Sequence, residues 1–480
     1  MRDTGLFVDR DVELAELRAL ADRRRPAIAL VYGRRRVGKT YLLERAWADR
    51  RVFYFVAADA TPEINRKELI AELSAWCGRN LHQADYPSWR TVFRLLSDLA
   101  QDDQLIVVLD EFQYLMGGGD DIASQLVAVF DRELRGRPLL LALSGSSVTM
   151  MESLVGGNQP LFGRAEWSAK IGPFDYFDAA RMVAGRSHRD AALIYGIFGG
   201  TPRYLAAIEP GESLAEATMR TILSPRGEIY LQLEHVIEQE KGIRRAAEYN
   251  SILRAIADGD QVIGGIATKT GIDVIAVRAA LHTLEDLEYV RKERNFDAAP
   301  KSAYHYRLAD NALAFWFRFV YSNRSRLQAG AVADVWQHHV EPYLNGYMGK
   351  TFERICREAF HRRHADWGLP SAAGWARWEG QDRNRRSIEI DAVVRLDDNR
   401  MLAGEIKWSS KPVGTAVYAD LDRDLQDLAA SGHRWAREAL QPNHLAGRFF
   451  VSAAGVSPAM EQLIAATPAV SGWTLDDLYR

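Results

Sequence analysis

The feature that most constrains this chain is a glycine-rich segment, GRRRVGKT, at residues 33–40. The apolar run AIALVY at residues 27–32 predicts a buried strand before it, and YLLERAWADR at residues 41–50 predicts a helix after it. Two glycines in such a loop let successive backbone N–H groups turn toward one anion, and the positive end of the helix adds to the attraction. In this strand–loop–helix setting, the segment predicts a site for a nucleoside triphosphate.

The residues of this loop have distinct expected roles. Lys39 is expected to reach the β- and γ-phosphates of ATP, and the Thr40 hydroxyl is expected to bind Mg²⁺. ATP and Mg²⁺ are therefore the expected cofactors. The alternative is a turn rich in glycine and lysine before an ordinary helix. The residues expected to surround the phosphates are Gly33, Arg34, Arg35, Arg36, Val37, Gly38, Lys39 and Thr40.

Length and composition describe a large globular protein. A chain of 480 residues is too long for one hydrophobic core, so about three domains are expected. No apolar run approaches the roughly 18 residues of a membrane span, and the charged first residues do not resemble a signal peptide. Cys77 and Cys356 lie far apart, which indicates neither a disulfide framework nor a zinc site. We expect a cytoplasmic protein without membrane contact, and the net charge of −3 leaves any nucleic-acid contact to local patches.

A pair of carboxylates follows a second buried strand, in LIVVLDE at residues 105–111. Open α/β sheets bind their ligands at the carboxyl ends of their strands, where Asp110 and Glu111 stand. We expect Asp110 to hold Mg²⁺ through water beside Thr40, and Glu111 to orient and deprotonate the attacking water. An acidic turn without a catalytic role is the alternative.

Two further residues are candidates for the same reaction. The strand at residues 139–143 ends in serines, of which Ser146 is favoured as a sensor of the γ-phosphate; a small-residue turn with a helix cap is the alternative. Arg164 precedes a strand expected at residues 168–171 and is a candidate arginine finger, which would act on the nucleotide of a neighbouring subunit. For Arg164 the alternative is a solvated surface residue.

These motifs resemble those of the AAA+ superfamily, within its clade of archaeal-type ATPases that bacteria also carry. The resemblance implies ATP hydrolysis, a helical lid after the ATPase core and assembly into a homo-oligomer in the presence of ATP. Asp9 and Asp11 stand where the family has glycine and glutamate. The segments that carry the resemblance are FVDRDVEL (7–14), GRRRVGKTYLL (33–43), LDEFQYL (109–115), SGSSVTMMES (144–153) and GGTPRYL (199–205).

Residues 246–308 alternate helical patterns with short strands, which predicts a winged helix. Its second helix exposes Arg278 but also Glu285 and Asp286, so a packing module is favoured over a DNA-reading helix. The aromatic segment at residues 311–321 indicates a buried joint between domains rather than a platform for stacking bases.

The last part of the chain carries a constellation of charged residues suited to a metal. IEIDAVV at residues 388–394 and MLAGEIKW at residues 401–408 predict two strands joined by a turn. Glu405 and Lys407 share one sheet face, and an antiparallel partner can bring Asp391 beside them. These carboxylates and the Ile406 carbonyl form an oxygen cage suited to Mg²⁺, while Lys407 can stabilise charge on hydroxide or the phosphorane. Glu353, in a helix expected to open at GKTFE (349–353), can face the same metal.

This arrangement resembles the PD-(D/E)XK nuclease superfamily, specifically the domain of unknown function that follows archaeal-type ATPases. The resemblance implies a metal-dependent nuclease with Asp391, Glu405 and Lys407 as catalytic residues, and Glu353, Asp391 and Glu405 as metal ligands. The alternative is a nuclease-like fold that only binds. Residues 361–386 interleave arginine with tryptophan, which suits a nucleic-acid strand or, alternatively, a solvated loop over a tryptophan-rich core.

The expected fold is α/β and multidomain: an AAA+ P-loop core at residues 1–174, a helical lid at 175–242, a winged helix with aromatic joint at 243–330, and a restriction-endonuclease-like domain at 331–480. The expected function is ATP hydrolysis that controls the nuclease, with DNA as partner and RNA as a second option, in defence or DNA processing. The alternative is a signalling or scaffold ATPase whose last domain binds nucleic acid or protein without cutting.

Overall fold

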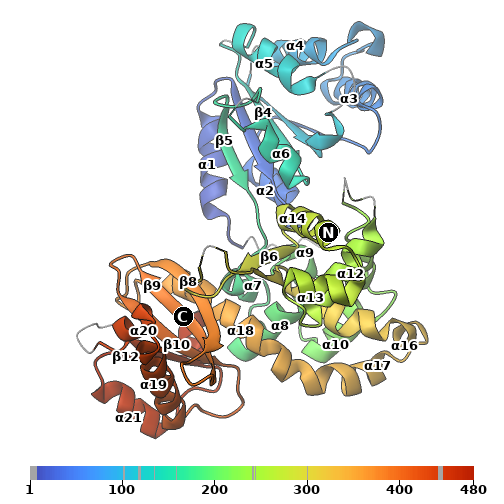
Figure 1. Cartoon of the computed structure of the whole chain (residues 1–480). Helices are drawn as coiled ribbons and strands as arrows, with labels where there is room; N and C mark the ends of the chain where they lie inside the picture. Colours follow the sequence, from blue (N-terminus) through green and yellow to red (C-terminus); the bar gives the residue numbers. More distant parts are fainter. Residues whose placement is uncertain are drawn as a thin grey trace. The chain divides into compact units, whose positions relative to one another are not determined.

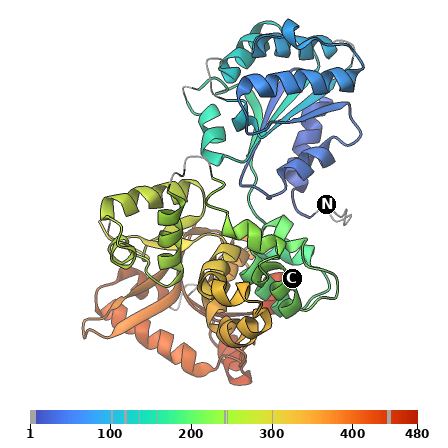
Figure 2. The ribbon, with the colours of Figure 1, turned by 90° about the vertical axis from the view of Figure 1, so that its right-hand side faces the viewer.

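The computed structural model of the chain describes residues 8–100, 103–116, 121–134, 136–157, 159–240, 243, 245–299, 301–441 and 447–480. The chain divides into two compact units, Met1–Pro173 and Phe174–Arg480 (Figures 1 and 2). None of the helices formed by the described residues combines the length and apolar character that crossing a membrane requires. Phe7, the first residue of the FVDRDVEL segment, and Gly242, the last residue of the expected lid, lie outside the described residues.

The first unit is built on a five-stranded parallel sheet in the order β2-β3-β4-β1-β5. Because β4 lies between β1 and β3, the segments that follow these three strands leave the same edge of the sheet side by side. That edge brings the glycine-rich loop, the Asp110–Glu111 pair and the serines after β4 together. The strands are β1 (Ala27–Tyr32), β2 (Val52–Val56), β3 (Leu105–Asp110), β4 (Leu139–Gly145) and β5 (Ala165–Lys170).

Helices cover both faces of this sheet, which explains why its central strands are almost entirely apolar. One face packs against α1 (Asp11–Asp22) and α2 (Lys39–Ala46). The other face packs against four helices: α3 (Pro62–Cys77), α4 (Trp89–Leu99), α5 (Ile122–Arg132) and α6 (Val148–Leu154). Short turns of 3₁₀-helix, η1 (Gln83–Asp85) and η2 (Phe112–Tyr114), complete the unit.

The second unit begins with a group of short helices. The GGTPRYL segment lies between two of them, and Gly200 is required there because a Cβ atom would lie 1.8 Å from the Phe174 carbonyl oxygen. Phe174 N–H also donates to the Gly200 carbonyl at 2.8 Å, which fixes the chain at this crossing. The elements are α7 (Tyr176–Met182), α8 (His188–Phe198), α9 (Pro202–Leu205), α10 (Leu214–Thr218), the π-helical turn η3 (Met219–Leu223) and α11 (Glu228–Glu234).

Three helices and an antiparallel strand pair follow, as the alternating patterns at residues 246–308 predict. They are α12 (Ala246–Ala257), α13 (Ile263–Thr270), α14 (Val274–Asp286), β6 (Val290–Glu293) and β7 (His305–Leu308). The aromatic side chains at residues 315–317 and 319 are buried, as predicted, so they offer no platform for stacking bases. They lie in α15 (Asn311–Phe315) and η4 (Trp316–Val320), which lead through η5 (Tyr321–Asn323), α16 (Arg324–Gln328), α17 (Val332–Val335) and η6 (Trp336–Val340) into α18 (Glu341–Arg363).

The last part of the unit is a mixed five-stranded sheet in the order β12-β11-β10-β9-β8. The β8–β9–β10 strands are antiparallel, whereas β10, β11 and β12 run parallel. Its core contains apolar residues of α19, α20 and α21. The elements are β8 (Ala372–Gln381), β9 (Ser387–Leu396), β10 (Met401–Lys407), α19 (Thr415–Ala430), α20 (Arg434–Ala439), β11 (Arg448–Ser452), α21 (Pro458–Ala466), β12 (Val470–Thr474) and α22 (Leu475–Tyr479).

Two expectations about element boundaries are wrong. The helix that carries Glu353 does not open at Gly349: it begins at Glu341, with a proline in its first turn, where a missing N–H costs nothing. The strand expected at residues 168–171 begins at Ala165, directly after Arg164, because alternating small and polar residues still pair with β1 along the sheet edge.

The stretch at residues 361–386 is not the solvated loop of the alternative, because it includes the end of α18 and all of β8, and several of its side chains are engaged within the fold. Arg362 pairs with Asp175 and Asp178, each at 2.9 Å, and Arg386 pairs with Asp424 at 2.7 Å. The tryptophans pack within the domain, and Trp367 stacks on Trp473. These side chains are therefore engaged in holding the fold together.

Candidate functional site

Backbone geometry shapes the glycine-rich loop between β1 and α2. Gly33 has φ +150°, and a Cβ atom there would lie 2.0 Å from the Ile171 carbonyl oxygen, so only glycine fits. Gly38 has φ +95° at the start of α2, a conformation that other residues rarely adopt. The Val37 side chain is buried, and Arg35 Nη2 donates to the Tyr114 hydroxyl at 3.0 Å. The loop therefore has the turn that a phosphate cradle requires.

Lys39 lies inside this loop. Its side chain is only 6% exposed, and Nζ donates to the Gly33 and Arg34 carbonyls at 2.8 and 3.0 Å. Burial lowers the pKa of the Lys39 ammonium, whereas the charges of Glu111 and Asp110 oppose that shift. A cation held in this position is suited to a triphosphate, whose oxygens replace the carbonyls as partners.

Thr40 and Asp110 meet at the carboxyl edge of the sheet, as predicted. Thr40 Oγ1 donates to Asp110 Oδ2 at 2.9 Å, and the Tyr54 hydroxyl donates to the same oxygen at 2.6 Å. Glu111 N–H donates to Asp110 Oδ1 at 3.0 Å, which holds the second oxygen of the carboxylate. This hydroxyl–carboxylate pair fits Mg²⁺, which takes oxygen ligands and keeps several waters.

Glu111 and Ser146 also lie together. Ser146 Oγ donates to Glu111 Oε2 at 2.7 Å, and Gln113 Nε2 donates to Ser146 Oγ at 3.1 Å and to the same carboxylate. The capping alternative does not hold for Ser146, because Ser147 is the N-cap residue of α6 and its side chain makes no capping hydrogen bond. Glu111 has φ +52°, a left-handed conformation that residues other than glycine adopt rarely.

Arg164 is not among these residues. Ala165, which follows it, pairs with Ile28 near the start of β1, whereas the glycine-rich loop follows the other end of β1. Arg164 Nη2 lies 2.8 Å from Asp131 Oδ2, and Nη1 donates to the Pro160 carbonyl at 3.1 Å. The arginine is therefore at the opposite edge of the sheet from the loop of its own chain.

A second constellation lies in the mixed sheet and depends on a β-bulge. Between Ile390 and Val393, two residues of β9 oppose the single residue Arg377 of β8, and Asp391 is one of these two. Bulges re-aim side chains and occur often beside active sites. Here the bulge places Asp391 against the end of β10, where its Oδ2 accepts the Ile406 N–H at 2.9 Å.

Lys407 joins the two predicted carboxylates. Its Nζ lies 2.9 Å from Asp391 Oδ2 and 2.5 Å from Glu405 Oε2, so the predicted juxtaposition of the three residues is confirmed. Burial raises the pKa of the Glu405 carboxyl to about 8, and the charge of Asp391 adds to that rise. Burial lowers the pKa of Lys407, but the charges of Glu405 and Asp391 outweigh it and raise the pKa overall.

Glu353 lies at the margin of this group. It pairs with Lys350 at 2.7 Å, and its pKa is raised by burial and, to a lesser extent, by the charge of Asp391. Asp391, Glu405 and the Ile406 carbonyl offer the hard oxygen ligands that Mg²⁺ prefers. However, no three His, Cys, Asp or Glu side chains among the described residues are grouped closely enough to hold a metal ion by themselves.

The sequence predicted no role for three residues at these sites. Tyr54 on β2 reaches Asp110 only because β2 and β3 are neighbours in the sheet, whereas Gln113 on η2 lies just two residues after Glu111. Lys350 stands four residues from Arg354 on α18, and the GKTFER run contains both. Gln113 lies within the LDEFQYL segment and Lys350 within the GKTFE run, so both had a signal in the sequence, whereas Tyr54 had none.

Comparison with known proteins agrees with this geometry. Residues 7–208 match the model of a family described as an ATPase domain predominantly from Archaea, and residues 316–417 match one described as Archaea bacterial proteins of unknown function. An uncharacterized protein of Methanocaldococcus jannaschii is 25% identical over 427 residues, which cover 87% of this chain and 91% of that protein.

Two solved structures are similar to the chain. A Walker-type ATPase of Pyrococcus abyssi is 25% identical, with 65% of this chain and 96% of that chain covered and a TM-score of 0.50. The ORC2 protein of Aeropyrum pernix, in ADPNP and ADP complexes, is 15% identical, with 68% and 97% covered and a TM-score of 0.43.

The family match, the loop geometry and the order of the parallel sheet together define the class of the first unit. Its parallel sheet and loop fit the P-loop ATPase fold, and its sequence matches an ATPase domain family, which supports nucleotide binding. The resemblance of this part to archaeal-type ATPases is therefore confirmed. The family matched by residues 316–417 has no described activity, so the comparisons assign none to the C-terminal sheet.

Proposed function

We propose that this chain is an ATP-hydrolysing AAA+ protein that controls a metal-dependent nuclease in its C-terminal part. The observation that carries the proposal is the position of Lys407. Its Nζ contacts Asp391 Oδ2 at 2.9 Å and Glu405 Oε2 at 2.5 Å, so one ammonium group bridges two largely buried carboxylates. Such a group of acids with one lysine suits hydrolysis of a phosphodiester.

In the ATPase part, each residue has a role that follows from its position. Lys39 binds the β- and γ-phosphates, and Thr40 and Asp110 hold Mg²⁺, which neutralises charge on the phosphate oxygens. Glu111 orients the attacking water and accepts its proton, while Ser146 and Gln113 position the Glu111 carboxylate. In this scheme Ser146 acts on the base as well as sensing the γ-phosphate.

In the C-terminal site, Asp391 and Glu405 hold Mg²⁺ together with the Ile406 carbonyl, and Glu353 adds to its affinity. When bound there, Mg²⁺ would supply activation of a water molecule and charge stabilisation on the phosphate. Asp391 is kept in place by the Ile406 N–H, and Lys407 stabilises negative charge that develops on the phosphate or on the attacking hydroxide.

The domain limits follow the same scheme: the ATPase core at residues 1–174, a helical lid at 175–242, a winged helix with the aromatic joint at 243–330 and a restriction-endonuclease-like domain at 331–480. The order of α12, α13, α14, β6 and β7 supports the winged helix.

Arg164, at the far edge of its own sheet, supports assembly of several copies with ATP, in which it acts on a neighbour's nucleotide. DNA, or alternatively RNA, is the proposed substrate, and the cytoplasm is the proposed location.

A panel of plasmid DNA, single-stranded DNA and RNA, incubated with Mg²⁺ in the presence and absence of ATP, tests the proposal. Glu405→Ala should abolish cleavage and keep ATP hydrolysis, whereas Glu461→Ala, an exposed carboxylate on α21, should cleave like the wild type. Lys39→Ala should lose triphosphate binding, and Glu111→Gln should bind ATP without turning it over. Cleavage that survives in Glu405→Ala would place the nuclease elsewhere.

One observation favours a second function, that of a scaffold ATPase whose last domain binds without cutting. No three-residue metal cluster is present among the described residues, and Lys407 already neutralises part of the charge of the acidic pair. For this function the panel should show no cleavage by the wild type with any divalent metal, while nucleic acid or a protein partner still binds.

A further inference from the structure

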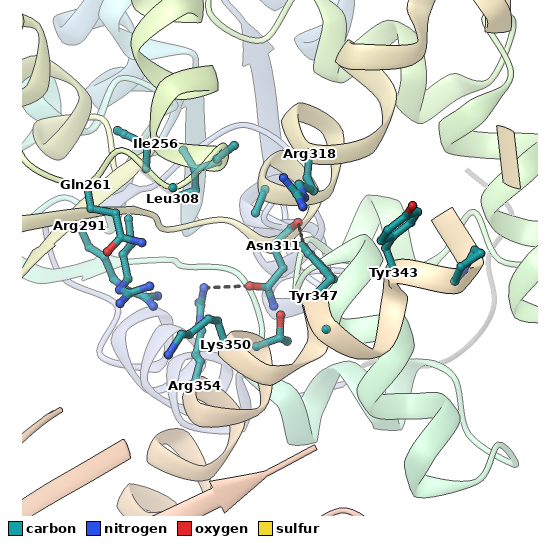
Figure 3. A pocket seen from close by; sticks show the side chains of 17 residues that line it. Ile256, Gln261, Arg291, Leu308, Asn311, Arg318, Tyr343, Tyr347, Lys350 and Arg354 are labelled. Atoms are coloured by element: carbon teal, nitrogen blue, oxygen red, sulfur yellow. Dashed lines mark hydrogen bonds between the residues drawn. The ribbon is translucent and has the colours of Figure 1, made fainter. Parts of the chain in front are cut away.

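A cavity of about 450 Å³ lies in the second unit, between the end of α12, the β6–β7 pair and α18. Figure 3 shows side chains from these separate elements around it. No Asp or Glu is among the described residues that line it. Five cationic side chains do line it: Arg291, Arg307, Arg318, Lys350 and Arg354.

Carboxylates outside the cavity balance part of the charge of these side chains: Lys350 pairs with Glu353 at 2.7 Å, and Arg354 pairs with Glu358 at 2.8 Å. Arg291 and Arg307 share a single carboxylate, Glu293, at 2.8 and 2.7 Å. Arg318 is exposed and has no ion-pair or hydrogen-bond partner within the part of the chain that the structure describes. Burial lowers the pKa of Arg291, and the charge of Arg354 adds to that shift. An anion in the cavity would relieve this crowding of like charges.

One face of α18 forms the floor of the cavity and continues beyond it. Tyr343, Tyr347, Lys350 and Arg354 follow one another at helical spacing, so they lie on the same face. From Tyr343 to Glu353 the helix rises by about 15 Å, the length of about four stacked nucleotides. The face therefore leads from the exposed end of the cavity to the acidic site.

A second cavity, of about 700 Å³, makes this connection. It shares Arg291, Arg307, Lys350 and Arg354 with the first cavity, and its lining extends to Glu353 and Asp391. Eight lysine or arginine side chains line it against five carboxylates. Basic residues thus continue from Arg318 to the carboxylates that the proposed nuclease uses.

An aromatic side chain stands at the outer end. Tyr343 is 57% exposed, which is unusual for a large aromatic residue and leaves its ring free to stack. Grooves for single strands combine cations that follow the backbone with aromatic rings on which bases stack.

We propose that these two cavities form a track for single-stranded nucleic acid, which we call the α18 track. Arg318, Arg291, Arg307, Lys350 and Arg354 bind its phosphates, Tyr343 stacks on a base, and the strand runs along α18 toward Asp391. The track deepens the proposed nuclease function, because it names an unpaired strand as the substrate. It rests on that function only for the cleavage of the strand, not for its binding.

Binding of a fluorescein-labelled oligothymidylate of about 12 nucleotides, a length within the site sizes of single-strand grooves, tests the track. Fluorescence anisotropy is measured with the full chain in EDTA, where metal-dependent cleavage cannot occur, over a range of salt concentrations. Tyr343→Ala should raise Kd about tenfold, as loss of one stacked base does. Arg318→Ala should raise Kd and reduce the slope of log Kd against log salt by about 0.7, the value for one lost phosphate contact.

Arg434→Ala is the matched control, because Arg434 is 88% exposed on α20 and lines neither cavity. Its Kd and salt slope should equal those of the wild type. A thermal unfolding temperature equal to that of the wild type shows that each variant is folded. Unchanged binding in both Tyr343→Ala and Arg318→Ala would overturn the track.

Two further measurements distinguish a bound strand from a smaller ligand, and the track from the nuclease. Thymidine monophosphate should compete far more weakly than the oligothymidylate; equal competition would mean that the cavity holds a small phosphate ester, which would overturn a strand. A wild-type chain that binds the oligothymidylate through Tyr343 and Arg318 but cuts nothing with Mg²⁺ would uphold the track and refute the nuclease. Cleavage at the wild-type rate in both Tyr343→Ala and Arg318→Ala would support the nuclease and refute the track.

Discussion

Ser146 Oγ donates to Glu111 Oε2 at 2.7 Å, so the residue after β4 holds the carboxylate after β3. The contact exists because β4 lies between β1 and β3, which brings the segments after those strands to one edge of the sheet. Gln113 binds both groups and completes a small network beside the phosphate-binding loop. The base of the proposed ATPase reaction is therefore positioned by a hydroxyl from another strand.

Replacing Ser146 tests this positioning. Ser146→Ala should lower kcat for ATP hydrolysis by about tenfold, the factor expected for one lost hydrogen bond to a charged group, and should change KM little. Ser147→Ala is the control, because this neighbouring serine makes no side-chain capping bond and should hydrolyse ATP like the wild type. Steady-state kinetics at saturating ATP distinguish the two. Equal rates in both variants would contradict a role for Ser146.

Gly33 should tolerate no side chain. A Cβ atom would lie 2.0 Å from the Ile171 carbonyl oxygen at φ +150°, so Gly33→Ala must displace the loop or the end of β5. We expect a loss of more than about 2 kcal/mol in stability together with loss of ATP binding. Gly78→Ala is the matched control: Gly78 has φ +67° and open space around it, so it should cost about 1 kcal/mol and leave ATP binding intact. Urea unfolding and an ATP-induced thermal shift measure both effects.

Local patterns in the sequence were enough to predict the phosphate-binding loop and the acidic hairpin. The strand at residues 27–32 coincides with β1, and Glu405 and Lys407 share a face because strand geometry repeats every two residues. Contacts that depend on strand order could not be predicted in the same way. Tyr54 reaches Asp110 only because β2 pairs with β3.

Two other features required the folded chain. The bulge that aims Asp391 is a mismatch between β9 and β8, so it has no signature in β9 alone. The cations of the α18 track come from β6, β7, η4 and α18, which are far apart in sequence. The sequence instead made the arginine-rich stretch at residues 361–386 a candidate nucleic-acid surface. The ion pairs and ring contacts that engage its side chains are tertiary, so the sequence could not show them.

Substitutions of Arg164 and of its ion-pair partner Asp131 can distinguish a catalytic role of the arginine from a structural one. If Arg164 acts on a neighbour's nucleotide, Arg164→Ala should lower ATP turnover by about 10³-fold or more. Asp131→Ala removes the 2.8 Å ion pair but keeps the arginine, so its turnover should stay close to the wild-type value. Sedimentation with ATP should show assembly. Equal losses in both variants, or full activity as a monomer, would return Arg164 to an ordinary surface residue.

Glu133 should make stability depend on pH in the acidic range. Hydrogen bonds from Arg94 and, to a lesser extent, Arg90 lower the pKa of the Glu133 carboxyl to about 2. Because this folded-state pKa lies below the unfolded value of about 4.3, its stabilisation is present above that value and is lost as pH falls toward 2. The pair is partly exposed, so the effect is below about 1 kcal/mol.

Urea unfolding at about pH 6 and about pH 3 measures this contribution. Glu133→Gln should unfold earlier than the wild type at the higher pH and lose less stability between the two conditions. Arg94→Gln should also lose less stability than the wild type between the two pH values, because the Glu133 pKa returns toward its ordinary value without Arg94. If the stability of both variants depended on pH as that of the wild type does, the contact between Glu133 and Arg94 would not stabilise the fold.

Asp391, Glu405 and Lys407 should respond to substitution as a unit. The two carboxylates lie within hydrogen-bond distance of one Nζ and are largely buried, so they repel each other wherever the lysine does not fully compensate. Glu405→Ala should therefore raise the thermal unfolding temperature in EDTA while it removes the stabilisation that Mg²⁺ gives the wild type. Asp391→Ala should likewise abolish cleavage, since one of the two carboxylates beside Lys407 is lost.

Lys407→Ala should behave differently from the carboxylate variants. The remaining acids still hold Mg²⁺, so the metal-dependent thermal shift should persist, whereas the cleavage rate should fall by about 10² to 10³, because the lost charge is needed at the transition state. Lys67→Ala is the matched control, since Lys67 is a half-exposed lysine on α3 in the first unit and should cleave at the wild-type rate. If Lys407→Ala lost the Mg²⁺-dependent shift as fully as Glu405→Ala, the lysine would be a structural clamp for the acids, and the C-terminal sheet would be better described as a binding module.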